Sequence, residues 1–220
     1  MSILSVVATP IGNLEDITLR ALRTLKECDA IFCEDTRVTS KLLAKYEISK
    51  PLVRCDERAE EKAAARALEM LEEGKNIALV SDAGTPGVSD PGSRLVAAVR
   101  DAGHTIVAIP GPSALTAALS IAGLKDGEFI FLGFLPHKKG RQTLLKEIAT
   151  EERAVVLYES PHRIEKLLSE LTTFAPEKNA MLFRELTKMH EEVLTGTPQE
   201  LWARLDTDGS ARGEFVVIVH

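Results

Sequence analysis

Residues 81–92 are the stretch whose composition points most directly to a ligand. They read Ser-Asp-Ala-Gly-Thr-Pro-Gly-Val-Ser-Asp-Pro-Gly and follow an apolar run at residues 77–80. Glycine lets a backbone adopt positive φ and approach a ligand closely, while proline stiffens a loop. Such loops bind ligands where they follow the carboxyl end of a strand in an α/β sheet. The alternative is a strand–helix connection that is simply rich in turn residues.

Two more loops of this kind occur in the same half of the chain. Residues 9–14 read Thr-Pro-Ile-Gly-Asn-Leu, and residues 110–113 read Pro-Gly-Pro-Ser. Each follows an apolar run, so the three loops can line one pocket at the carboxyl edge of a parallel sheet. The glycine-rich fingerprints of dinucleotide and phosphate loops are absent, as are His-Glu-x-x-His and Gly-x-Ser-x-Gly. We therefore expect a small organic ligand, with no metal and no serine nucleophile.

The composition limits the class of protein. The chain has 220 residues and a net charge of −6, and no apolar run approaches the roughly 18 residues that span a bilayer. Without a signal-peptide pattern, we expect a cytoplasmic protein with no membrane contact. The acidic balance argues against coating nucleic acid through overall charge, although a local basic patch can still bind phosphates.

The elements that must position these loops alternate between strand and helix. Strands are expected near residues 4–8, 30–33, 52–54, 77–80 and 105–109, with helices between them and at residues 114–121. This alternation predicts a parallel α/β sheet. After a change of character near residues 123–128, strands at 129–134, 154–158, 180–184, 192–196 and 215–219 alternate with helices and turns, which predicts a mixed sheet. Two domains, 1–123 and 124–220, follow, with the natural site in the cleft between them.

A series of motifs resembles a known family. The first half contains Thr-Pro-Ile-Gly-Asn-Leu, Glu-Asp-Thr-Arg, Ser-Asp-Ala-Gly-Thr-Pro, Asp-Pro-Gly and Gly-Pro-Ser-Ala. The second half adds Gly-Phe-Leu-Pro, Tyr-Glu-Ser-Pro-His-Arg and Arg-Glu-Leu-Thr-Lys. Together they resemble the S-adenosylmethionine-dependent methylases of the tetrapyrrole methylase superfamily and, within it, the ribosomal RNA small subunit methyltransferase I family.

That resemblance implies a fold, a reaction and partners. It implies a two-domain α/β architecture with S-adenosyl-L-methionine bound between the domains. The reaction would methylate the ribose 2′-oxygen of a cytidine in the decoding region of small-subunit (16S) rRNA. The substrate would be that rRNA or the assembled 30S subunit, and the enzyme would be a homodimer. Members often carry a further C-terminal helical extension, whereas this sequence stops at His220.

The resemblance also assigns residues to the methyl donor. In the first domain and at the following helix start these are Pro10, Ile11, Gly84, Thr85, Val88, Ser113 and Ala114, with free backbone amides at the helix start suited to a carboxylate. In the second domain Tyr158, Phe183 and Glu214 would enclose the adenine. Asp82 could accept a hydrogen bond from the donor's ammonium or ribose, or it could be a turn residue. Tyr158 and Phe183 could equally be core aromatics.

The chemistry needs a proton acceptor, because a ribose hydroxyl has a pKa far above 7. The candidates are Glu34, Asp35, Glu159, Glu185 and Lys188. Asp35 could instead cap a helix, and Glu185 could pair with Arg184. The sequence leaves these options open.

RNA contacts are expected in the basic loop at residues 136–141. Its candidates are His137, Lys138, Lys139 and Arg141, with Arg37, Lys41 and Arg163 as possible flanking contacts. A solvated basic loop is the alternative.

Two other functions are compatible with parts of the pattern. A tetrapyrrole C-methyltransferase would keep the fold and the donor, but the Thr-Pro-Ile-Gly-Asn loop differs from the more glycine-rich first loop of those enzymes. A non-catalytic RNA-binding assembly factor would have lost donor binding, and the intact loops argue against it.

Overall fold

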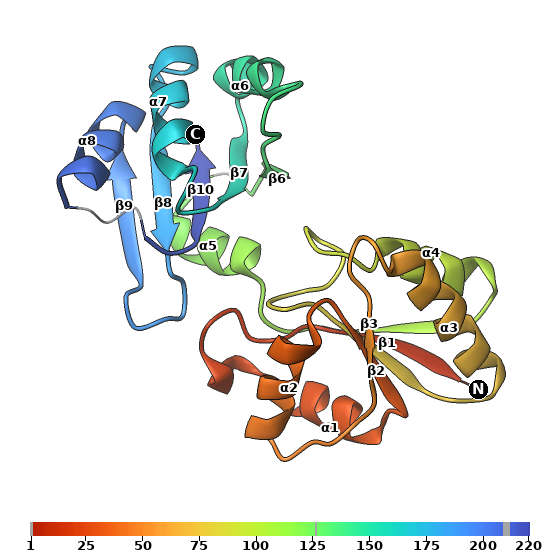
Figure 1. Ribbon diagram of the computed structural model, residues 1–220. Coiled ribbons are helices and arrows are strands. Elements are labelled where there is room, and N and C mark those ends of the chain that lie inside the picture. The colour runs from red at the N-terminus through yellow and green to blue at the C-terminus, as the bar shows by residue number, and fades with distance from the viewer. Residues whose placement is uncertain (1, 126, 209–211) are drawn as a thin grey trace. The chain divides into compact units, whose positions relative to one another are not determined.

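A computed structural model describes residues 2–125, 127–208 and 212–220 of the chain (Figure 1). The chain divides into two compact units, Met1–Ser113 and Ala114–His220. This division falls earlier than the boundary expected at residue 123. The reason is that helix α5 (Ala114–Ala122) packs against strand β10 (Phe215–Val219) and therefore belongs to the second unit.

The first unit is built on a five-stranded sheet in which every strand is parallel to its neighbours. The order is β3-β2-β4-β1-β5. The strands are β1 (Ile3–Val7), β2 (Ala30–Cys33), β3 (Leu52–Arg54), β4 (Ile77–Val80) and β5 (Thr105–Ile109). The expected strand positions and the parallel sheet are confirmed.

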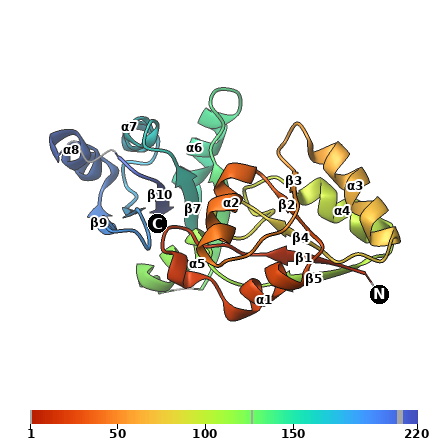
Figure 2. The same ribbon diagram turned by 60° about the horizontal axis from the view of Figure 1, so that its bottom comes forward.

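Helices cover both faces of this sheet (Figures 1 and 2). They are α1 (Leu19–Glu27), α2 (Thr36–Lys45), α3 (Glu60–Glu72) and α4 (Ser93–Asp101), with a short 3-10 turn, η1 (Leu14–Asp16). Successive residues of a strand point to opposite faces. Phe32 and Leu79 accordingly pack with α3 and α4, while Ile31 and Val80 pack with α1 and α2. Burial on both faces explains why these strands are continuously apolar.

Local signals fix the helix ends in this unit. The Thr18 hydroxyl accepts a hydrogen bond from the Ala21 amide at 3.0 Å and caps α1, whereas Asp16 lies in η1. A side-chain acceptor at this position satisfies an amide that the helix leaves unpaired. The helix therefore begins directly after its capping residue.

The second unit contains the expected mixed sheet, with the order β6-β7-β10-β8-β9. β6 and β7 are parallel, and the other neighbouring pairs are antiparallel. The further elements are β6 (Phe129–Phe134), α6 (Arg141–Thr150), β7 (Ala154–Glu159), α7 (Ile164–Phe174), β8 (Ala180–Arg184), β9 (Glu192–Gly196) and α8 (Pro198–Asp208).

One apolar core holds the second unit together. Leu157, Leu182 and Val217 point from the sheet into a cluster with residues of α6, α7 and α8. Among the described residues, no helix has both the length and the apolar character that crossing a membrane requires.

Candidate functional site

The three Gly/Pro loops of the first unit converge. Thr9 and Gly84 form an isolated antiparallel bridge, in which each amide donates to the other residue's carbonyl at 2.8 and 3.0 Å. The Thr9 hydroxyl also donates to the Ser81 carbonyl at 3.2 Å, and the Thr85 hydroxyl donates to the Pro112 carbonyl at 3.1 Å. Loops 9–14, 81–92 and 110–113 thus meet at one edge of the sheet.

The sheet topology explains why a ligand would bind at this edge. β1 and β4 are neighbours, but β1 leads to α1 on one face and β4 leads to α4 on the other. Loops that leave adjacent parallel strands toward opposite faces open a crevice at the carboxyl ends of the strands. The contacts between the three loops bring together residues that the sequence expectation had assigned to the donor, including Ile11, Gly84 and Thr85.

Gly84 is the glycine of loop 81–92 that lies against both other loops. Its φ is +78°, a conformation that side chains disfavour. A Cβ atom here would lie 3.4 Å from Ile11 Cγ2 and 3.9 Å from the Pro112 carbonyl oxygen. The backbone of loop 81–92 can therefore lie close against the other two loops.

Glu60 fixes the far end of loop 81–92. This carboxylate is only 6% exposed, and its Oε1 accepts hydrogen bonds from the Gly92 and Arg94 amides at 2.9 and 2.8 Å. It thereby satisfies donors at the start of α4, for which Gly92 offers no side-chain cap. Sequence reasoning missed Glu60, because its partners lie on another helix.

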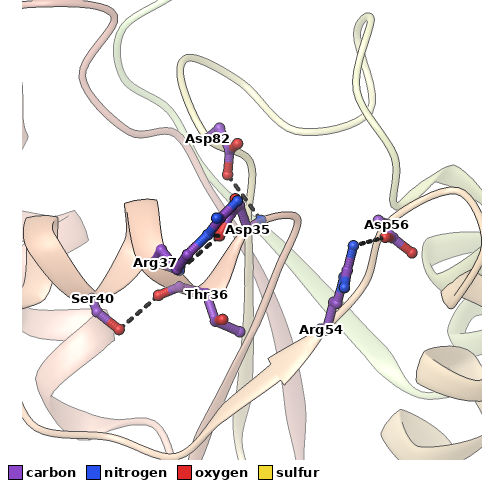
Figure 3. A network of polar contacts seen from close by, with 7 residues as sticks. All are labelled: Asp35, Thr36, Arg37, Ser40, Arg54, Asp56 and Asp82. Carbon is purple, nitrogen blue, oxygen red and sulfur yellow. Dashed lines mark hydrogen bonds and ion pairs between the residues drawn. The ribbon is translucent and has the colours of Figure 1, made fainter.

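Acidic side chains gather where β2 and β4 end (Figure 3). The Asp82 carboxylate accepts a hydrogen bond from the Asp35 amide at 3.0 Å. Asp35 in turn caps α2 by accepting from the Arg37 amide at 2.8 Å, and it pairs with the Arg37 guanidinium. Arg37 donates to the Asp35 carboxylate from its guanidinium and from its backbone amide. These hydrogen bonds hold the pKa of Asp35 far below its ordinary value. The capping role, left open by the sequence, is the one that the geometry supports.

The pKa of Glu34 is shifted in the opposite direction from that of Asp35. Burial raises the pKa of its carboxyl, and the negative charges of Asp82 and Asp90 raise it further. Burial and the charge of Asp82 also raise the pKa of Asp90, against a hydrogen bond from Ser81. Asp90 was not among the expected site residues, although the Asp-Pro-Gly triplet marks it. Among the described residues, no group of three or more His, Cys, Asp or Glu side chains is arranged to hold a metal ion.

In the second unit, the ends of β8 and β10 bring Glu185, Lys188 and Glu214 together. The Lys188 ammonium donates to Glu185 Oε1 at 2.7 Å and to Glu214 Oε2 at 2.8 Å. The Glu214 amide donates to Glu185 Oε1 at 2.9 Å. Burial opposes the charge on Lys188, but these two carboxylates outweigh it and raise the pKa of Lys188.

This network changes the expectations for two candidate bases. Lys188 is held as an ammonium and has no lone pair with which to accept a proton. Glu185 is committed to Lys188 and the Glu214 amide, which lower its pKa despite burial. The alternative pairing of Arg184 with Glu185 is not the one present, since Arg184 Nη1 lies 3.0 Å from Glu192 Oε2 on the neighbouring strand.

The aromatic candidates occupy one sheet of the second unit. The Tyr158 ring makes edge contacts with Phe131 and Phe134, and its hydroxyl accepts a hydrogen bond from the Leu115 amide at 3.1 Å. One of the amides at the start of α5 is thus already used by Tyr158. Phe183 is fully buried and lies in register with Val216 of β10. Val216 is also in register with Tyr158, on the other side of β10. Its surroundings match the alternative of a core aromatic.

Comparison with known proteins adds to this geometry. The family model for tetrapyrrole (corrin/porphyrin) methylases matches residues 4–201. A protein of Thermotoga maritima named "Ribosomal RNA small subunit methyltransferase I" is 44% identical over 219 residues, which cover 100% of this chain and 98% of that protein. One of the same name from Synechocystis sp. is 47% identical over 221 residues, which cover 100% of this chain and 79% of that protein.

The chain belongs to the ribosomal RNA small subunit methyltransferase I family. The expected family is confirmed, and the expected α/β fold class agrees with the neighbouring solved structures. One of them, the crystal structure of a diphthine synthase, superposes with a TM-score of 0.75 at 17% identity and covers 99% of this chain and 89% of that one. At such low identity the match speaks for the fold alone.

In this methyltransferase I family member, the basic residues fall into two groups. Lys41, His137, Lys138 and Lys139 are exposed, as is Arg37, whose guanidinium pairs with Asp35. Arg141 and Arg163 are not surface cations. The Arg141 side chain is 4% exposed and pairs with Glu170, while the Arg163 side chain is 17% exposed and pairs with Glu159. Pairing with carboxylates leaves these two arginines less available to RNA than the exposed lysines are.

Glu159 does not suit the role of a proton acceptor either. Its side chain is fully buried at the end of β7, where Oε1 accepts from the Ser160 amide at 2.8 Å. A group with no exposed surface cannot reach a ribose hydroxyl, even though burial raises its pKa.

Proposed function

We propose that this protein transfers the methyl group of S-adenosyl-L-methionine to the ribose 2′-oxygen of a cytidine in small-subunit rRNA. The observation that carries the proposal is the identity of 44% and 47% to the two relatives named above, over the whole of this chain. The name of those relatives supplies the rRNA substrate. The motif resemblance supplies the donor and the 2′-oxygen.

The crevice of the first unit is the proposed binding site for part of the donor. Backbone groups around Gly84, with Pro10, Ile11, Thr85 and Val88, would approach it closely, and the half-buried Asp82 would accept a hydrogen bond from it. No phosphate-binding lysine stands in these loops, which suits a donor without phosphates. The further donor-binding residues proposed from the resemblance are Ser113, Ala114, Tyr158, Phe183 and Glu214.

Glu34 is the proposed proton acceptor. In the reaction a bond forms between the 2′-oxygen and the methyl carbon, and the bond from that carbon to sulfur breaks. Its electron pair stays on sulfur, and the hydroxyl proton passes to the Glu34 carboxylate. The sulfonium group supplies the electrophile, so the protein mainly has to align oxygen, carbon and sulfur. Glu34 is supported by its partial exposure and raised pKa, while Asp35, Glu159, Glu185 and Lys188 are engaged elsewhere.

The test is methyl transfer in vitro. Purified protein is incubated with 30S subunits that lack the modification and with donor carrying a labelled methyl group. We expect label on one cytidine ribose, located by nuclease digestion and mass spectrometry. Label on a base, or transfer to a tetrapyrrole but not to rRNA, would contradict the proposal.

Two properties accompany the proposed function. The resemblance implies a homodimer, which light scattering on the purified protein would detect as twice the mass of 24.0 kDa. An rRNA substrate would place the reaction in the cytoplasm, where ribosomal subunits are assembled.

A further inference from the structure

The cationic loop, residues 136–140, is held at both ends by buried side chains. Leu135 before it is 2% exposed and Arg141 after it is 3% exposed, whereas residues 137–140 are exposed. At its end, the Arg141 amide donates back to the Lys138 carbonyl at 3.2 Å. Gly140 adopts a φ of +85° before α6 begins. The loop therefore protrudes from fixed ends.

Two guanidinium groups hold the backbone where the loop begins. Arg163, at the start of α7, donates to the Leu135 carbonyl. Arg141, at the start of α6, donates to the Pro136 carbonyl at 3.2 Å. The two helices pack beside each other, so both arginines reach the same short stretch of backbone (Figure 1).

Each of these arginines has its own carboxylate. Arg141 Nε donates to Glu170 Oε2 at 2.7 Å, and Arg163 Nε lies 3.4 Å from Glu159 Oε1. Buried charges are costly unless they are paired, and in this arrangement each cation is. The charges of the two arginines are therefore balanced locally, and the loop presents the charges of Lys138 and Lys139 to an anionic partner.

Glu159 is the innermost member of this cluster. Its Oε1 accepts from the Ser160 amide, while its Oε2 is buried and has no hydrogen-bond partner among the described residues. A fully buried carboxylate so incompletely satisfied opposes folding. Its position beside Arg163 gives it a role in orienting the guanidinium that holds Leu135.

We infer that Glu159, Arg163, Arg141 and Glu170 are positioning residues for rRNA binding. They fix the cationic loop so that Lys138 and Lys139, with His137, contact RNA phosphates, and they do not contact RNA themselves. The inference rests on the proposed function and deepens it, because it separates the residues that touch the substrate from those that act through the loop.

Glu159→Gln provides the sharpest test. The change removes a negative charge, so electrostatics alone predicts tighter RNA binding. The positioning role predicts the reverse, a dissociation constant for a 16S rRNA fragment that rises about tenfold. The matched control is Glu165→Gln, which removes the same charge from an exposed position in the first turn of α7. The control should bind RNA as tightly as the wild type or slightly more tightly.

RNA binding is measured directly, by fluorescence anisotropy at fixed salt, and donor binding by calorimetry reports on folding. Glu159→Gln with unchanged or tighter RNA binding overturns the inference. A wild-type protein that binds donor but no rRNA would instead contradict the proposed function. If Glu159→Gln does not fold, Arg163→Lys replaces it, because lysine retains the charge without the two-point contact; it should weaken RNA binding severalfold, and unchanged binding would overturn the inference.

A double-mutant cycle distinguishes an effect of Arg163 through the cationic loop from direct contact between Arg163 and RNA. Arg163→Ala should weaken RNA binding in the wild type but add little in a Lys138→Ala/Lys139→Ala background. Arg153→Ala, which removes an arginine from a surface ion pair with Glu151, is the control and should have a small effect in both backgrounds. Fully additive losses for Arg163→Ala would identify it as an RNA contact and overturn the inference.

Discussion

At the scale of single residues, Glu34 is the proposed general base. It follows β2 directly, is partly exposed, and has a pKa raised by burial and by the charges of Asp82 and Asp90. Its neighbour Asp35 has a pKa far below the ordinary range, because Arg37 holds its carboxylate. The pKa values of two adjacent carboxyl groups are thus shifted in opposite directions by their surroundings.

We predict that Glu34→Gln lowers the rate of methyl transfer by roughly 10²–10⁴-fold, the range typical for loss of a general base. The active form is the carboxylate, so the wild-type rate should fall as pH decreases through a pKa above that of an ordinary glutamate. Single-turnover rates across pH measure both effects. Asp35→Asn is the control and should keep this acid limb; a Glu34→Gln enzyme with the wild-type pH profile would exclude Glu34.

Gly84 and Gly103 form a matched pair for testing the crevice. Their φ angles are +78° and +79°, so alanine at either position should cost about 1–2 kcal/mol of folding stability. Only at Gly84 would the new methyl group occupy the proposed donor site, in van der Waals contact with Ile11 at 3.4 Å. We therefore expect Gly84→Ala to weaken donor binding by tenfold or more, measured by calorimetry, and Gly103→Ala to leave it unchanged. Equal donor affinities in the two variants would argue against a donor site at Gly84.

At the scale of elements, α3 supports loop 81–92 through Glu60. Glu60→Ala would leave the Gly92 and Arg94 amides without their acceptor in a buried site. We expect a loss of about 1–3 kcal/mol in chemical denaturation and weaker donor binding, because the loop loses its far anchor. Glu61→Ala, on the same helix but exposed, should change stability by less than about 0.5 kcal/mol. Similar losses in both variants would show that the anchor is unimportant.

At the scale of the whole molecule, the charge distribution predicts how RNA binding depends on salt. The chain carries a net charge of −6, so binding must depend on local cations such as those of the cationic loop. With two or three phosphates neutralised, the slope of log K against log salt should lie between about −1 and −3. Binding titrations from low to high salt measure it. A much steeper slope would mean that a larger basic surface takes part.

Much of the fold and of the site could be predicted from the sequence. The hydrophobic periods located the strands and helices of both units, and the Gly/Pro loops marked the candidate donor site. These features are local, since each depends on a few consecutive residues and on the backbone conformations that they allow.

The remaining features depended on contacts between distant segments. Strand order placed β4 beside β1, and only that arrangement brings Gly84 to Thr9. Packing of α6 against α7 buried Arg141, and strand register paired Arg184 with Glu192. A basic side chain looks the same in a sequence whether it meets a carboxylate or solvent. The sequence by itself determined which segments carry the chemistry, and the tertiary structure decided which charges remain available for it.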